Sequence, residues 1–129
     1  MLLLFLCTIS MMSCDDDDDK FTFTGAALKQ TQWTGTYFRS YIAAGQPATG
    51  TYDIGIIFYT DSTGLSSIDR DEYGFNYSID DKMLLVTNGD SYLNGYWLLR
   101  QADENSMSLE QGTGGENAFK ATLTLTRKK

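Results

Sequence analysis

The sequence predicts an all-β domain, and three observations lead to that fold class. Apolar and polar residues alternate with a period of two along several short runs, most clearly at residues 119–126. Turn-forming Gly, Asn, Asp and Ser separate these runs at fairly even intervals. Aromatic residues make up 13% of the chain, eight of them tyrosines, and proline occurs once. This composition favours strands over helices.

The individual elements follow from these patterns in chain order. Residues 25–30 are expected to form a short helical turn, and no helix of ten residues or more is predicted after it. The segment at 96–101 is apolar on both faces, so its pattern leaves the strand register open. The expected strands are residues 34–42, 51–60, 65–69, 73–79, 82–87, 96–101, 106–110 and 119–126. The expected turns are residues 45–47, 61–64, 69–72, 80–81, 88–90, 102–105 and 112–115.

Short connections between consecutive strands predict how the strands are arranged. Strands joined by tight turns lie antiparallel to one another. About eight such strands close into an antiparallel up-and-down β-barrel, which removes exposed edges and leaves room for one small ligand. A two-sheet β-sandwich uses similar strand patterns and is the alternative.

The first twenty residues differ from the rest of the chain. Residues 1–12 form an apolar run of signal-peptide length, too short to span a bilayer as a helix. Ser13-Cys14 at the end of this run resembles the lipobox of bacterial lipoproteins, which implies cleavage before Cys14 and lipid attachment to it. The acidic block that follows resembles the surface-export signal of Bacteroidetes lipoproteins, and its repelling charges predict an extended tether. The block consists of Asp15, Asp16, Asp17, Asp18 and Asp19.

These features predict three segments and a location. Residues 1–13 are expected to be a signal peptide, residues 14–24 a lipidated acidic tether, and residues 25–129 the barrel domain. Lipid on Cys14 implies a protein anchored in the outer membrane and exposed at the cell surface. Several acyl chains, each contributing roughly 0.8 kcal/mol per buried CH₂, make such an anchor stable.

Charge and missing residue types exclude several functions. The net charge is −7, but residues 21–129 carry nine basic and twelve acidic side chains, so most of the excess belongs to the aspartate block. We therefore expect no nucleic-acid partner, because such binding needs clustered Lys and Arg. Histidine is absent, and the two cysteines lie at positions 7 and 14, before the domain. No thiol nucleophile, no metal site and no cofactor are expected in it.

The strand motifs resemble those of the small lipocalin-like lipoproteins of Bacteroidetes. They are Trp33-Thr34-Gly35-Thr36-Tyr37, residues 57–64, residues 75–79 and residues 123–127, in an order that covers most of residues 28–127. The resemblance implies that Trp33 plugs the closed end of the barrel and that Arg127 stacks on it, a contact of about 1 kcal/mol. The chain has Thr31 where the family pattern has glycine.

Two non-catalytic functions remain open. In the first, the open end of the barrel binds a small apolar or glycan-like ligand through aromatic side chains. In the second, the barrel is filled and the protein acts as an interaction or structural lipoprotein, or an inhibitor, that meets an envelope protein through a patch around Tyr92, Tyr96 and Trp97. The candidate ligand-lining residues are Tyr37, Tyr41, Tyr52, Tyr77, Tyr96 and Trp97.

Catalysis is the least supported function. Carboxylates are the only candidate catalytic groups, and pairs of them can hydrolyse glycosides when one has a raised pKa in an apolar cleft. Here they lie in charged turns, where solvation and turn formation explain them, and no Ca²⁺-binding loop pattern is present. The protein is therefore expected not to be an enzyme. The acids concerned are Asp61, Asp69, Asp71, Glu72, Asp80 and Asp81.

Overall fold

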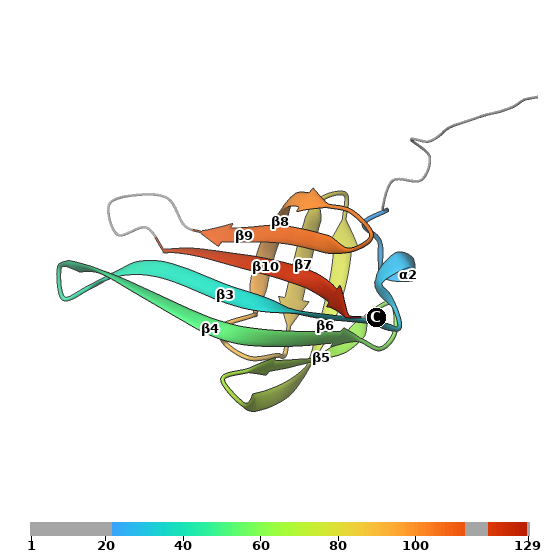
Figure 1. Ribbon diagram of the computed structural model, residues 1–129, viewed down its shortest axis with the longest axis horizontal. Coiled ribbons are helices and arrows are strands. Elements are labelled where there is room, and N and C mark those ends of the chain that lie inside the picture. The colour runs from blue at the N-terminus through green and yellow to red at the C-terminus, as the bar shows by residue number, and fades with distance from the viewer. Residues whose placement is uncertain (1–21, 113–118, 129) are drawn as a thin grey trace, which may run out of the picture.

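The chain folds into one closed antiparallel barrel. In the computed structural model, which describes residues 22–112 and 119–128, eight strands close in the order β10-β3-β4-β5-β6-β7-β8-β9 (Figure 1). The predicted up-and-down barrel is confirmed, and the sandwich alternative is wrong. The predicted leader, Cys14 and the aspartate block lie outside the described residues. The elements are α2 (Gly25–Leu28), β3 (Thr31–Ala43), β4 (Gln46–Phe58), β5 (Thr63–Ile68), β6 (Asp71–Asp80), β7 (Met83–Thr87), β8 (Gly95–Ala102), β9 (Ser106–Gly112) and β10 (Lys120–Lys128).

The interior of the barrel is occupied by the inward-facing half of each strand. On β10, Ala121, Leu123 and Leu125 are buried, while the intervening threonines face outward, as the alternation predicts. Every strand contributes at least one buried apolar residue to a single core cluster. On β8 the structure settles the open register, because Trp97 is fully buried and Tyr96 is 62% exposed. Side chains can fill a barrel of this size.

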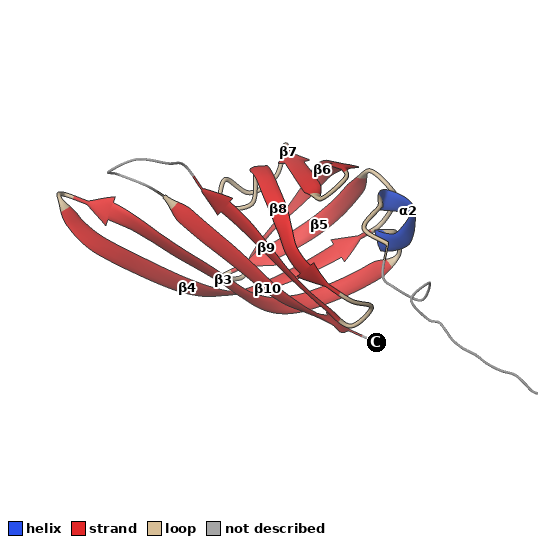
Figure 2. Cartoon of the chain, turned by 90° about the horizontal axis from the view of Figure 1, so that it is seen from above, coloured by secondary structure: helices blue, strands red, loops and turns tan. Residues whose placement is uncertain are grey.

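The helix α2 covers one end of the barrel (Figure 2). Thr24 caps it by accepting a hydrogen bond from the backbone N–H of Ala27 at 3.1 Å. Leu28, at its end, is fully buried in the core. The Thr31 hydroxyl donates to the carbonyl of Leu28 at 2.5 Å and accepts from the indole N–H of Trp33 at 2.9 Å. Every polar atom of this chain of contacts therefore has a partner inside the closed end.

The hairpin of β3 and β4 projects past the barrel at the opposite end (Figure 1). The two strands pair along their full lengths, but β5 accompanies β4 only from Ile54 to Phe58. On the other side, β10 accompanies β3 only as far as Ser40. Pro47, which has no N–H to donate, lies in the part of β4 that has no outer partner. This end also carries the β5–β6 turn and the β7–β8 loop, so we call it the open end.

Several turns are shorter than the sequence predicts. The predicted turn at 45–47 is wrong, because the chain reverses at Ala44-Gly45 with φ of 52° and 78°, and residues 46 and 47 already pair in β4. The predicted loop at 69–72 reduces to Asp69-Arg70, with φ of 51° and 75°. Two residues with positive φ match the twist of the flanking strands, which lets pairing continue up to the turn.

Candidate binding site at the open end

A group of aromatic rings lies at the open end of the barrel. Tyr37 on β3, Tyr52 on β4 and Tyr92 in the β7–β8 loop form what we call the tyrosine cluster. The Tyr37 and Tyr92 rings stack with centroids 5.4 Å apart, and the Tyr52 centroid lies 5.3 Å from that of Tyr92. The Trp97 ring meets the edge of Tyr37 at 6.1 Å and is fully buried. Offset and edge contacts at these distances each contribute about 0.5–1.5 kcal/mol beyond burial.

The β7–β8 loop holds Tyr92 in this position through its own hydrogen bonds. The Asp90 carboxylate accepts from the backbone N–H of Tyr92 at 2.9 Å, and the Asn94 side chain both accepts from and donates to the backbone of Gly89. The Trp97 indole N–H donates to the carbonyl of Leu93 at 2.7 Å, and Leu93 is buried. The loop is therefore tied to the core beneath it.

Arg39 lies beside the tyrosine cluster on the inward-facing side of β3. Its guanidinium carbon is 4.6 Å from the ring centroid of Tyr41 and 4.7 Å from that of Tyr92. Both distances are within the range of cation–π attraction. The Nε atom of Arg39 is buried and has no hydrogen-bond partner. A buried donor left without an acceptor costs about 1–3 kcal/mol.

The phenol groups and Arg39 influence one another electrostatically. Burial raises the pKa of Tyr37, and the nearby Arg39 charge only partly offsets this. A hydrogen bond with Tyr92 raises the pKa of Tyr52, on which Arg39 also acts in the opposite direction. Burial lowers the pKa of Arg39, but its hydrogen bond with Tyr41 and the neighbouring phenols outweigh this and raise it overall. The Tyr37 and Tyr52 phenols therefore stay protonated and Arg39 stays charged at neutral pH.

A groove of about 830 Å³ runs beside the tyrosine cluster. The groove follows β4, with residues of β3 on one side and the end of β5 and the Asp69-Arg70 turn on the other. Tyr52 belongs to both the groove and the cluster. The lining residues are Thr34, Gly35, Thr51, Tyr52, Asp53, Ile54, Gly55, Ser67, Asp69 and Arg70.

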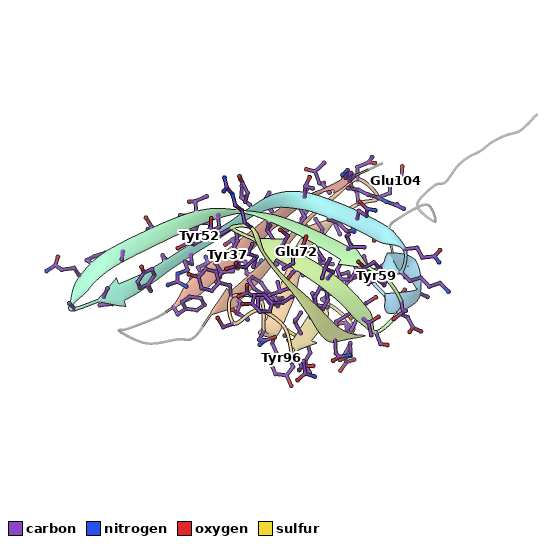
Figure 3. The ribbon with its side chains drawn as sticks, turned by 90° about the horizontal axis from the view of Figure 1, so that it is seen from below. Tyr37, Tyr52, Tyr59, Glu72, Tyr96 and Glu104 are labelled. Atoms are coloured by element: carbon purple, nitrogen blue, oxygen red, sulfur yellow. The ribbon has the colours of Figure 1, made fainter. Side chains whose placement is uncertain are left out.

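The predicted ligand-lining residues fall into two groups. Tyr37, Tyr52 and Trp97 come together at the open end, and Figure 3 shows the first two side by side. Tyr77 packs instead on Phe58, with ring centroids 5.0 Å apart, within the aromatic core beside the β4–β5 turn. Tyr96 faces outward, away from the cluster (Figure 3). Tyr77 and Tyr96 therefore do not lie with the other three residues at the open end.

The sequence analysis considered only aromatic residues as ligand-lining, so it did not identify the charged residues of the site. Arg39 lies an even number of residues from Trp33 and Tyr37 on β3, so its side chain is on the same, inward face of the strand. This spacing is the feature of the sequence that could have identified it. Asp53 and Arg70 carry no motif. They join the groove because β4 outruns β5 and because the turn is only two residues long.

Tyr77 provides a pH-dependent test of the core. Its hydroxyl donates to the carbonyl of Thr60 at 2.6 Å, and burial, followed by the charge of Asp61, raises the pKa of Tyr77 to about 12. The unfolded chain has a tyrosine pKa near 10. The contribution of Tyr77 to the free energy of unfolding should thus be complete below about pH 10 and be lost as the pH rises towards 12. Urea unfolding at pH 8 to 11.5 should show a shallower alkaline loss in Tyr77→Phe, and parallel curves would refute this assignment.

Trp33 and Arg127 are cross-strand partners on β3 and β10, so their side chains leave the same face of the sheet. Trp33 is buried and Arg127 is half-buried. The stacking of Arg127 on Trp33 stays a prediction. Arg127→Ala should shift the emission of Trp33, measured in a Trp97→Phe background, and an unchanged spectrum would argue against the contact.

A second, apolar groove of about 400 Å³ lies on the outer face of β7, β8 and β9 and includes the start of β10. Met83, Tyr96, Leu98 and Phe119 line it, together with Glu110, Gln111, Gly112 and Lys120. Of the patch predicted around Tyr92, Tyr96 and Trp97, only Tyr96 belongs to this surface.

Comparisons with known proteins identify no family or relative that would assign a function to the site. A scan against protein-family models finds no match, and a search of curated proteins finds no relative. Within the described residues, no helix has both the length and the apolar character needed to cross a bilayer. Across residues 22–112 and 119–128, no three acidic side chains gather closely enough to hold a metal ion.

Proposed function

We propose that the protein is a lipid-anchored, surface-exposed lipoprotein whose barrel binds a glycan-like ligand without catalysis. The observation that carries this proposal is the position of Tyr52, which lies in the tyrosine cluster and also lines the groove of about 830 Å³. Tyr52 therefore links the tyrosine cluster to the groove. The lipid on Cys14 and the acidic tether would hold the open barrel at the membrane surface.

The chemistry of the groove favours a sugar over an apolar ligand. Asp53, Asp69 and Arg70 supply charged acceptors and donors, and the threonine and serine lining supplies hydroxyls. Sugars combine many hydroxyl groups with apolar ring faces, so they match a polar groove beside tyrosine rings. The buried side chains inside the barrel support a ligand that lies at the rim rather than in the interior.

The β5–β6 turn supports the same proposal. Type I′ turns favour Asn-Gly, because both central residues have positive φ. This chain keeps Asp69-Arg70 there, although a left-handed conformation costs roughly 1–2 kcal/mol per ordinary residue. Strain of this kind is common where side chains serve a site.

The direct test is a thermal-shift screen of the full chain with neutral and acidic oligosaccharides. A bound sugar should raise the melting temperature, because it stabilises only the folded state. The double variant Tyr52→Ala/Tyr92→Ala should lose this ligand-induced rise, measured relative to its own unliganded melting temperature. Tyr59→Ala and Tyr96→Ala are matched controls, since these exposed tyrosines lie near α2 and on the outer face (Figure 3). Equal losses in the controls, or no sugar that stabilises the protein, would overturn the proposal.

Arg70→Gly separates stability from binding. Glycine adopts positive φ without strain, so the free energy of unfolding should rise by about 1 kcal/mol. The same change removes the groove cation, so the affinity for a sugar that stabilises the wild type should fall. Urea unfolding and calorimetric titration measure the two effects. A less stable variant, or one that binds as tightly as the wild type, would contradict the assignment of this turn to the site.

A further inference from the structure

Arg39 is a cation at the open end that does not line the groove of about 830 Å³. Among the described residues, ion pairs form at Arg100–Glu110, 3.7 Å apart, and Lys120–Glu110, 3.8 Å apart, both on the outer surface. Arg39 belongs to neither. Its guanidinium is held by the rings of Tyr41 and Tyr92 instead of by a carboxylate.

Small residues flank Arg39 on both neighbouring strands. Its cross-strand partners are Gly50 on β4 and Ala121 on β10, which have the two smallest side chains. A Cβ at Gly50 would come within 3.1 Å of the Tyr52 ring, so glycine lets that ring lie across the strand towards Arg39. The tyrosine rings and the arginine therefore form one continuous surface at the rim.

This surface contains no anionic partner for the guanidinium of Arg39. Aromatic faces attract the guanidinium, and the hydroxyls of Tyr37 and Tyr41 form hydrogen bonds with it, but no carboxylate of the described residues pairs with it. The buried Nε atom meets no acceptor. The matching group is a planar or tetrahedral oxyanion, because a guanidinium binds such groups through paired, charge-assisted hydrogen bonds.

Building on the proposed function, we infer that the ligand is an acidic sugar, and that Arg39 binds its oxyanion while Tyr52 and Tyr92 contact its ring. The carboxylate of a uronic acid and a sulfate or phosphate ester share this chemistry. The acidic groove residues Asp53 and Asp69 lie on the other side of Tyr52 and are left to pair with sugar hydroxyls.

The test compares probes that differ in one group. Phenyl β-D-glucuronide and phenyl β-D-glucoside share both rings, and only the first carries a carboxylate. By calorimetric titration of the full chain, the glucuronide should bind at least about 10-fold more tightly, as expected for a charge-assisted hydrogen bond. Added salt should reduce this preference, because the rim is open to solvent. Phenyl phosphate and phenyl sulfate then show which oxyanion is preferred.

Variants of Arg39 assign the effect to that residue. Arg39→Gln should bind both sugars with equal affinity, and Arg39→Lys should keep only part of the preference, because it retains the charge but loses the planar fork. Arg100→Gln, at an outward-facing arginine, is the matched control and should behave as the wild type. Circular dichroism of each variant checks that the barrel is folded.

The outcomes separate the two proposals. If both sugars bind equally tightly to the wild type and Tyr52→Ala/Tyr92→Ala loses both, the acidic preference is refuted while glycan binding stands. If Arg39→Gln keeps the preference for the glucuronide, the assignment to Arg39 is wrong. If neither sugar binds at millimolar concentration, while another sugar stabilises the protein, the inference fails alone. If no sugar binds at all, both proposals fail.

Discussion

Replacing Trp97 by alanine is expected to lower the free energy of unfolding by about 3–5 kcal/mol. The Trp97 side chain is fully buried at the centre of the barrel, under the ring of Tyr37. Its indole N–H is the donor to the carbonyl of Leu93, so the substitution also releases the loop that positions Tyr92. The expected result combines a cavity in the core with the loss of an anchor for the tyrosine cluster.

Urea unfolding at neutral pH measures this effect, and the neighbouring residue provides the control. Tyr96→Ala removes a similar volume from the outward face of the same strand, where the side chain is 62% exposed, and should change the free energy of unfolding by no more than about 0.5 kcal/mol. Similar losses in the two variants would contradict the strand register. Trp97→Phe should fall between them, since it fills part of the space but donates no hydrogen bond.

Gly35→Ala is expected to destabilise the barrel by about 1–3 kcal/mol. Gly35 lies on β3 opposite Leu125 of β10, and an added Cβ would collide with the backbone carbonyl oxygen of Thr124. That oxygen belongs to the sheet, so it can move only if the two strands separate. Because β3 and β10 are the first and last strands of the barrel, the strain falls on the seam that closes it.

A second glycine in the same region provides the control for this prediction. Gly55 on β4 also lines the groove, but its nearest contact for an added Cβ is at 3.9 Å, an ordinary van der Waals distance. Gly55→Ala should be neutral or slightly stabilising, because alanine restricts the unfolded chain. Thermal unfolding of the two variants should separate clearly, and equal melting temperatures would contradict the close approach at Gly35.

The fold was largely predictable because the alternation along the strands is strong. On β10 the two-residue period gives the buried face directly, and the short turns give the antiparallel order. The pattern fails on β8, because Tyr96 and Trp97 are both aromatic and only the three-dimensional packing decides which of them faces inward. The turns predicted from the pattern are also too long, because charged residues such as Asp71 look like loop residues although they pair in an exposed strand.

The site was less predictable, because its residues meet only once the barrel closes. Tyr37 and Tyr52 were identified as aromatic strand residues, and their cross-strand pairing places them together. Arg39 looks like an ordinary charged residue until its position between Tyr41 and Tyr92 is known. Tyr92 comes from a loop whose hydrogen bonds, rather than any periodicity, determine where its ring lies.

The measurement that tests ligand binding at the open end most directly is NMR mapping of backbone amides during titration with phenyl β-D-glucuronide. We expect the largest shifts at Arg39, Tyr52, Asp53, Arg70 and Tyr92, which span the tyrosine cluster and the groove. We expect little change at Tyr96 and Leu98 on the outer face or at Leu28 in α2. Shifts centred on the outer face or on α2 would contradict binding at the open end, and no shifts at all would contradict the binding of an acidic sugar there.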